Sequence, residues 1–180
     1  MLKRIFDIVL SLLALFLCWW LLIFLYFIAS LSTNSNGLFV QSRIGRYGKP
    51  FSIYKFRTID SHGIMNATSR FLRRSKLDEL PQLINVLKGD MSFVGPRPDI
   101  PGYYDVLTGE NRKILALRPG ITSAASIKYR SEEALLSMQS DPLHYNDNII
   151  YPDKIQMNLD YYYNQTFFGD IVILWKTVFG

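Results

Sequence analysis

Two adjacent carboxylates, Asp78 and Glu79, are the side chains of this sequence best placed to do chemistry. They open a segment in which Leu80, Leu83 and Leu87 recur at helical spacing. The dipole at a helix N-terminus favours the ionised form of a carboxylate, and a carboxylate must be ionised to act as a nucleophile. The pair is therefore a candidate nucleophile with an assisting acid.

The start of this helix is marked by Ser75 and Pro81. Ser75 is a suitable N-cap. A proline is tolerated in the first turn, where its missing N–H costs little. We therefore expect the helix to begin near Asp78.

Cations flank the acid pair on both sides. The segment 70–76 carries four basic residues, and Gly95-Pro96-Arg97-Pro98 forms a rigid turn that presents one guanidinium. Arginine binds phosphate oxygens bidentately, so the pattern favours a phosphorylated substrate. The alternative is a capped helix with solvated charges, which leaves the rigid turn around Arg97 unexplained.

Composition narrows the class of protein. The chain has 180 residues, which is enough for one domain, and it is 49% hydrophobic. The net charge of +5 fits an anionic partner: nucleic acid, an anionic membrane surface or a phosphorylated substrate. Cys18 is the only cysteine, so an intrachain disulfide and a cysteine-based zinc site are excluded.

The run from Ile8 to Leu31 is almost wholly apolar and long enough to cross a bilayer as a helix. Basic residues stand on both sides of it, at Lys3 and Arg4 and from Arg43 onward. Since cytoplasmic flanks carry the positive excess, both ends are expected on one side, which favours a re-entrant or interfacial helix. The run contains no proline or glycine to break it, so a straight span stays the alternative.

The remaining segments predict an α+β fold that is mainly helical. Residues 38–44 and 51–57 read as the strands of a short β-hairpin, with Lys55 and Arg57 on one face. We expect loops over 60–69 and 141–153, and helices over 103–117, from 131 onward and over 154–163. The apolar segment 167–179 is too short to span a membrane and fits either core packing or an interfacial helix.

Several long motifs resemble the bacterial sugar transferases known as monotopic phosphoglycosyl transferases, which start lipid-linked glycan assembly. The resemblance runs from Lys3 to about Phe179. Its blocks are Lys3-Arg-Ile-Phe-Asp, Tyr54-Lys-Phe-Arg-Thr, Leu77-Asp-Glu-Leu-Pro-Gln-Leu, Asn85-Val-Leu-Lys-Gly-Asp-Met-Ser, Gly95-Pro-Arg-Pro and Arg118-Pro-Gly-Ile-Thr. Two places depart from the family pattern: Cys18-Trp19 replaces a Ser-Pro pair, and the run from Ser123 to Arg130 replaces the usual one, of which Arg130 keeps the register.

The resemblance implies a UDP-sugar donor, a polyprenyl (undecaprenyl) phosphate acceptor and Mg²⁺. Asp78 would attack the donor, release UMP and carry the phosphosugar until the acceptor displaces it. Glu79 would assist as a metal ligand, an orienting group or a base, and Asp78 would also contact the metal. Phosphate groups would be held by Arg97, Arg73, Lys55 and Arg57, and the nucleotide by Arg118 and Arg130.

The resemblance also implies a place in the cell and a set of partners. Residues 1–36 would anchor the chain in the bacterial inner membrane among its lipids, with the catalytic domain 37–180 on the cytoplasmic face. Nucleic acid is not an expected partner, a homodimer is one of the expected oligomeric states, and the sugar is expected to be an N-acetylated amino-deoxy sugar. Two alternatives remain: a non-catalytic basic membrane adaptor, and direct one-step transfer with Asp78 as the base.

Overall fold

The computed structural model describes residues 1–180, and the chain divides into two compact units. The first comprises residues 1–43 and 50–92, and the second comprises residues 44–49 and 93–180. The α+β, mainly helical fold is confirmed, with two separate two-stranded sheets. The division at residue 36 into a membrane segment and a cytosolic domain stays a prediction.

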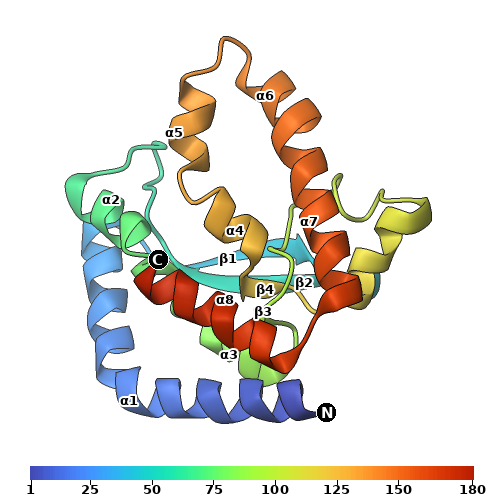
Figure 1. Cartoon of the computed structure of the whole chain (residues 1–180). Helices are drawn as coiled ribbons and strands as arrows, with labels where there is room; N and C mark the ends of the chain where they lie inside the picture. Colours follow the sequence, from blue (N-terminus) through green and yellow to red (C-terminus); the bar gives the residue numbers. More distant parts are fainter. The chain divides into compact units, whose positions relative to one another are not determined.

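The first unit begins with the 32-residue helix α1 (Leu2–Thr33), which is long and apolar enough to cross a membrane. Figure 1 shows that α1 bends sharply about half-way along its length. No residue between Ser11 and Leu25 is buried. In this middle stretch the indole N–H of Trp20 donates a hydrogen bond to the Leu17 carbonyl, 3.0 Å away. Backbone hydrogen bonds weaken where a helix bends, and a side-chain donor to a backbone carbonyl compensates for that loss.

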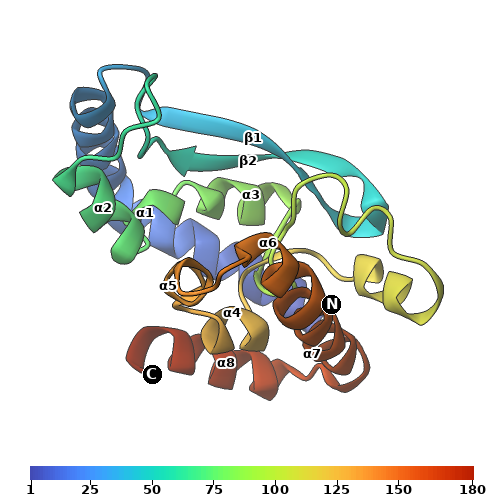
Figure 2. The ribbon, with the colours of Figure 1, turned by 90° about the horizontal axis from the view of Figure 1, so that it is seen from above.

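The rest of the first unit packs against the two arms of α1. The strands β1 (Leu38–Ile44) and β2 (Pro50–Phe56) form the expected hairpin, with the short 3₁₀ turn η1 (Arg46–Gly48) at its tip. Helix α2 (Ala67–Arg74) leads to a 3₁₀ turn, η2 (Leu77–Glu79), and then to α3 (Gln82–Lys88). The hairpin lies over α3 (Figure 2).

Polar contacts fix the N-terminal arm of α1 to the C-terminal end of α3. The Arg4 guanidinium donates to the carbonyls of Val86 and Leu87, at 2.6 and 2.9 Å. These carbonyls belong to the last turn of α3, where a cation is favourable. Asp7, which is buried, accepts a hydrogen bond from the Ser92 hydroxyl at 3.1 Å. The apolar helix is thereby tied to the helix that follows the acid pair.

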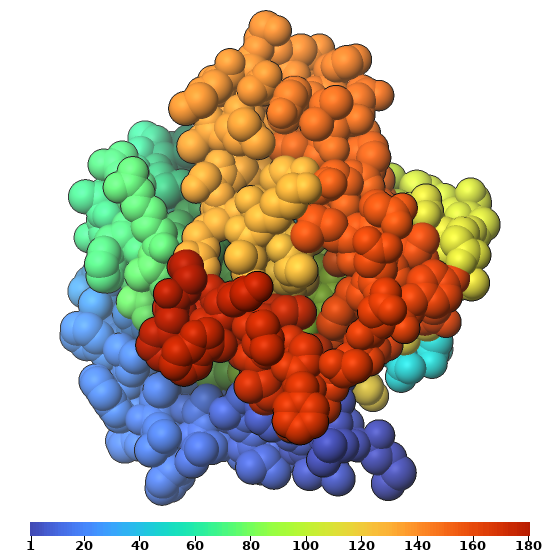
Figure 3. Space-filling view, in the orientation of Figure 1, coloured from blue at the N-terminus to red at the C-terminus, as the bar shows by residue number.

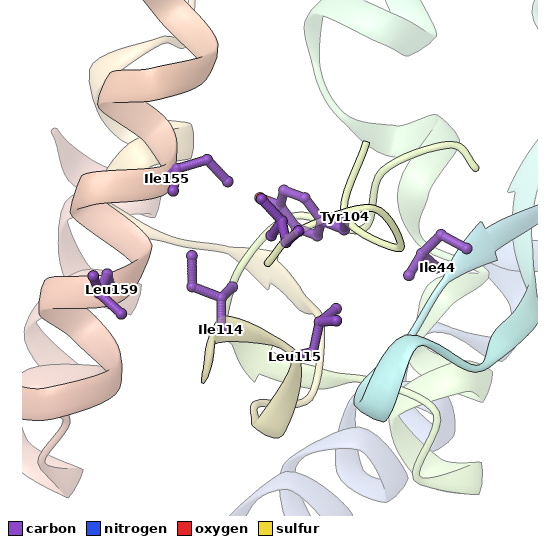
Figure 4. Packing of buried hydrophobic residues seen from close by; sticks show 7 residues of the cluster. Ile44, Tyr104, Ile114, Leu115, Ile155 and Leu159 are labelled. Atoms are coloured by element: carbon purple, nitrogen blue, oxygen red, sulfur yellow. The ribbon is translucent and has the colours of Figure 1, made fainter. Parts of the chain in front are cut away.

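The second unit is built around helix α7 (Tyr151–Asn164) and the 3₁₀ helix η3 (Gly109–Ala116). Their side chains meet in an apolar cluster centred on Tyr104 and Ile114 (Figure 4). The other elements are β3 (Ser92–Val94), β4 (Gly120–Thr122), α4 (Ala124–Lys128), α5 (Glu132–Ser137), α6 (Pro142–Tyr145), the π-helical turn η4 (Asn146–Ile150) and α8 (Phe167–Phe179).

Three secondary-structure expectations were wrong. The segment 103–117 contains only the 3₁₀ helix η3, and helix α2 begins inside the expected loop 60–69. The expected loop 141–153 is helical, because α6, η4 and α7 follow one another without a break. Core packing of α8 is not observed: Asp170 is its only buried residue, and apolar residues such as Phe168 and Trp175 are exposed. Helix α8, the red end of the chain, lies at the surface in Figure 3.

Two glycine motifs of the sequence meet in the second unit. The Gly95 N–H donates to the Thr122 carbonyl at 3.0 Å, and the Gly120 N–H donates to the Pro96 carbonyl at 2.8 Å. A Cβ atom on Gly120 would overlap the backbone of Gly95. Glycine is therefore required at position 120 because the two backbone segments approach closely.

We predict that Gly120→Ala destabilises the protein by about 4 kcal/mol or more, because backbone atoms on both sides must move. Gly63→Ala is the matched control. Gly63 has a positive φ of 77° but open space around it, so the cost there is about 1 kcal/mol. Denaturant unfolding compares the two variants, and equal losses would contradict the packing argument.

Candidate active site

The acid pair lies in the 3₁₀ turn η2, directly before α3. Lys76 starts the turn in the left-handed conformation with a φ of 58°. Leu77 and Leu80 pack against the apolar cluster around Phe56 and Leu72. Residues three apart eclipse in a 3₁₀ turn, so the two leucines anchor one side of it. Asp78 and Glu79 are held between these anchors, and both are buried, with 7% and 8% exposed.

The position of Ser75 differs from the expectation. Ser75 is the C-cap of α2, and its hydroxyl donates to the Phe71 carbonyl at 2.7 Å. Its prediction as the N-cap of the following helix was wrong, because the chain reverses at Lys76 before the next turn begins. The expected helix start near Asp78 was also wrong: residues 77–79 form the separate turn η2, and α3 begins at Gln82 with Pro81 as its N-cap.

Electrostatics around the pair differ from the helix-dipole expectation. Burial, followed by the neighbouring Glu79 carboxylate, raises the pKa of Asp78 to about 6, although Lys55, Lys76 and Arg73 act in the opposite direction. Desolvation therefore outweighs any favourable dipole at this position. At neutral pH Asp78 is still mostly ionised, and it is more basic than an ordinary aspartate.

Lys55 contacts the pair through Glu79. Its Nζ lies 3.2 Å from Oε1 of Glu79, and 18% of its side chain is exposed. A half-buried ion pair of this kind is screened less by solvent than a surface pair. Lys55 thereby compensates part of the cost of burying two carboxylates side by side.

Asn85 positions the strand that carries Lys55, and the sequence analysis missed it. Its side chain is completely buried in α3, donates to the Ser52 carbonyl at 2.7 Å and accepts from the Tyr54 N–H at 3.1 Å. These bonds join α3 to β2 on both sides of Ile53. The available signal was an asparagine between apolar residues in a helical pattern, since such a residue usually has buried partners.

The other basic residues predicted in the first unit have different surroundings. Arg73 contributes to the electrostatic field at Asp78. Arg57 lies just beyond the end of β2, where it donates to the Asn36 carbonyl at 2.9 Å and lies over the Phe39 ring. Lys55 and Arg57 were expected to act together, but Arg57 lies outside β2 and the two side chains bind different groups.

Three predicted arginines belong to the second unit. Arg97 is exposed between two buried prolines, and Arg118 is half-buried next to Pro119. The pairing of β3 with β4 brings their two motifs together. Arg130 donates to the carbonyls of Gly180, Lys176 and Thr177 at 2.6–3.3 Å, which places it at the C-terminal end of α8. The nucleotide-binding roles of Arg118 and Arg130 stay predictions.

The residues that depart from the family pattern before Arg130 contact α7. Lys128 Nζ and the Tyr129 hydroxyl both lie 2.7 Å from Oδ2 of Asp153. Lys154 forms two contacts of 2.7 Å with Glu132. These pairs fasten α4 and α5 to α7, so this departure has a structural explanation.

The acid pair is suited to holding a magnesium ion only together with the phosphates of a substrate. Within either unit, no group of three or more His, Cys, Asp or Glu side chains lies together for a metal. However, Oδ1 of Asp78 is buried without a hydrogen-bond partner. Mg²⁺ is commonly held by one or two carboxylates together with substrate phosphates. The residues present fit that kind of site.

Comparison with known proteins identifies the family. The family described as "Bacterial sugar transferase" has a model that matches residues 1–180. The chain belongs to the bacterial sugar transferase family. This confirms the resemblance read from the motifs around Asp78, Arg97 and Arg118.

Individual members of the bacterial sugar transferase family match nearly the whole chain. The uncharacterized sugar transferase EpsL of Bacillus subtilis is 35% identical over 98% of this chain and 85% of its own length. The undecaprenyl-phosphate galactose phosphotransferase of Salmonella typhimurium is 30% identical over 98% of this chain. The UDP-glucose:undecaprenyl-phosphate glucose-1-phosphate transferase of Escherichia coli is 32% identical over 99% of it. The chain spans only 39% and 40% of the last two relatives.

Proposed function

We propose that this chain transfers a sugar 1-phosphate from a UDP-sugar to a polyprenyl phosphate. The observation that carries the proposal is the buried Asp78–Glu79 pair with Lys55 beside it. Two relatives, from Salmonella typhimurium and Escherichia coli, are named for transfer to undecaprenyl phosphate, and the second is also named for a UDP-sugar donor. The expected product is the first lipid-linked intermediate of a bacterial glycan.

The reaction would occur in two displacements at one phosphorus. An oxygen of the Asp78 carboxylate forms a bond to the phosphorus next to the sugar, and the bond to the UMP phosphate oxygen breaks with its electron pair. A phosphate oxygen of the polyprenyl acceptor then attacks the same phosphorus, and the electron pair of the breaking bond returns to Asp78. The raised pKa of Asp78 makes the carboxylate a better nucleophile than an ordinary aspartate.

The surrounding charges would neutralise and orient the diphosphate, which is most of what phosphoryl transfer needs. Lys55 holds Glu79 in place, and Arg73 adds positive potential at Asp78. Bound Mg²⁺, held by Asp78 with Glu79 nearby, would add charge stabilisation to the phosphate oxygens. Phosphate binding by Arg97 and nucleotide binding by Arg118 and Arg130 stay predictions from the sequence motifs.

The apolar helix would place this chemistry at a membrane, on its cytoplasmic face. Large apolar side chains of α1 are exposed along its whole length, among them Phe16, Trp20 and Phe27. In the second unit, helix α8 exposes Phe168 and Trp175. A long-chain lipid phosphate partitions into the same apolar phase. The bend in α1 (Figure 1) supports a re-entrant helix, with both ends on one side, over a straight span.

We predict that Trp20→Phe shifts α1 towards a straight span, because the Leu17 carbonyl loses its side-chain donor inside lipid. Trp19→Phe is the matched control, since both tryptophans are 59% exposed. Cys18→Ser removes the only cysteine, and Lys3→Cys then reports which face the N-terminus occupies. Labelling of intact spheroplasts with an impermeant maleimide should rise for Trp20→Phe alone, and equal labelling of both variants would contradict the prediction.

The proposed reaction is tested by UMP release from a panel of UDP-sugars with polyprenyl phosphate and Mg²⁺. The wild-type chain should release UMP with at least one donor, and the active donor names the sugar. An absence of release with every donor would overturn the UDP-sugar assignment. Other nucleotide donors would then be tested before the membrane-adaptor alternative, for which binding should follow total positive charge and salt.

A further inference from the structure

Two buried polar atoms without a hydrogen-bond partner belong to the same short stretch of chain. One is the acceptor Oδ1 of Asp78, and the other is the donor Nε2 of Gln82. Gln82 is only 2% exposed. Unpaired polar atoms in a protein interior are uncommon because each costs folding free energy. A donor and an acceptor left unpaired so near each other therefore need an explanation.

The backbone places the two side chains on neighbouring turns. The turn η2, the residues Leu80 (φ −54°, ψ −36°) and Pro81 (φ −60°, ψ −17°), and α3 form a continuous right-handed path. Residues four apart on such a path are neighbours, with Cβ atoms about 5–6 Å apart on a regular helix. An amide N–H can donate and a carboxylate oxygen can only accept, so the two groups are complementary.

We infer that Gln82 is a positioning residue for Asp78. Its amide N–H donates to Oδ1 during the reaction, and the other carboxylate oxygen is then the one that attacks phosphorus. In the phosphosugar intermediate Oδ1 is the carbonyl oxygen of an acyl phosphate, and the same hydrogen bond fixes its orientation. This inference rests on the proposed function, because it assigns Gln82 a role in the same two displacements.

The physical consequence is an opposition between stability and activity. An unpaired buried amide lowers stability, so replacing it with an apolar side chain of similar length should not destabilise the fold. The hydrogen bond to a charged oxygen is made in the reacting state, so its loss should slow the reaction. A residue that served only to pack α3 would show the opposite relation between stability and activity.

The experiment compares Gln82→Met with Leu83→Met, a packing control at the next buried position of α3. For Gln82→Met we expect kcat to fall about ten- to a hundredfold, since hydrogen bonds to charged groups are worth that much. KM for the UDP-sugar should change by less than about twofold, because ground-state binding is not affected. The melting temperature should equal or exceed that of the wild-type protein, and Leu83→Met should keep its kcat.

Two results would overturn the inference. One is a Gln82→Met variant with wild-type kcat, and the other is a variant whose melting temperature and kcat fall together. The wild-type protein and Asp78→Asn are assayed alongside. Failure of the proposed function appears as a wild-type chain that releases no UMP, which is distinct from an active wild-type chain with an unaffected Gln82→Met variant.

Discussion

An Asp78→Asn variant should release no UMP from any UDP-sugar and should be more stable than the wild-type protein at pH 7. The loss of activity follows from the mechanism, because an amide cannot form the acyl phosphate and return to a carboxylate. The expected fall in kcat is at least about 10³-fold, which is the range for the loss of a nucleophile. Binding of the UDP-sugar should persist, since the variant keeps the shape of the site.

The gain in stability follows from the raised pKa of Asp78. Burial, and then the Glu79 charge, raise the pKa of Asp78 to about 6 in the folded chain, against about 3.9 in an unfolded chain. Below about pH 4 the group is protonated in both states and costs nothing. The penalty grows as pH rises from 4 to 6 and is complete above that, so Asp78→Asn should gain about 1–3 kcal/mol at pH 7.

Thermal unfolding at pH 4 and pH 7 measures this difference. The stability gain of Asp78→Asn over the wild-type protein should be present at pH 7 and should largely disappear at pH 4. A variant that is equally stable at both pH values would show that Asp78 ionises freely in the folded protein. A less stable variant at pH 7 would show that the carboxylate is needed for the fold.

A Lys55→Met variant should lose activity about 10²-fold or more and should also lose stability. Lys55 is in contact with Glu79, and it lowers the pKa of Asp78. Without it, the buried Glu79 carboxylate loses an ion-pair partner, and the loss of one partner from a buried pair costs about 3–5 kcal/mol. The acidic limb of the pH–rate profile should move to higher pH, because the pKa of Asp78 rises.

Lys88→Met is the matched control for this prediction. Lys88 is paired with Asp90 at 3.6 Å, but 52% of its side chain is exposed. Surface pairs contribute less than about 1 kcal/mol, so the control should keep both activity and stability. The double variant Lys55→Met, Glu79→Gln should recover part of the lost stability. A double variant no more stable than Lys55→Met would contradict the pairing argument.

The sequence predicted the position of the acid pair because local patterns encode it. Helical spacing after Asp78 and a proline suited to a first turn were enough to place the pair before α3. The hairpin that carries Lys55 followed from alternation and flanking turns. The membrane-length helix α1 followed from composition alone.

The tertiary properties of the site could not be predicted in this way. The pKa of Asp78 depends on burial by residues distant in sequence, so a dipole argument at a helix N-terminus gave the wrong direction. The contact of Asn85 with β2 joins residues more than thirty positions apart. The approach of Gly95 to Gly120 likewise depends on the pairing of β3 with β4, which no local sequence pattern predicts.

The covalent intermediate on Asp78 is the central claim, and intact-protein mass spectrometry tests it most directly. The wild-type protein is mixed with the active UDP-sugar and Mg²⁺ in the absence of polyprenyl phosphate. We expect a mass increase of one phosphosugar, one UMP released per chain, and removal of the added mass when polyprenyl phosphate is supplied. Asp78→Asn should gain no mass. UMP release that requires the acceptor, with no adduct on the wild-type chain, would contradict the covalent route and support direct transfer with Asp78 as the base.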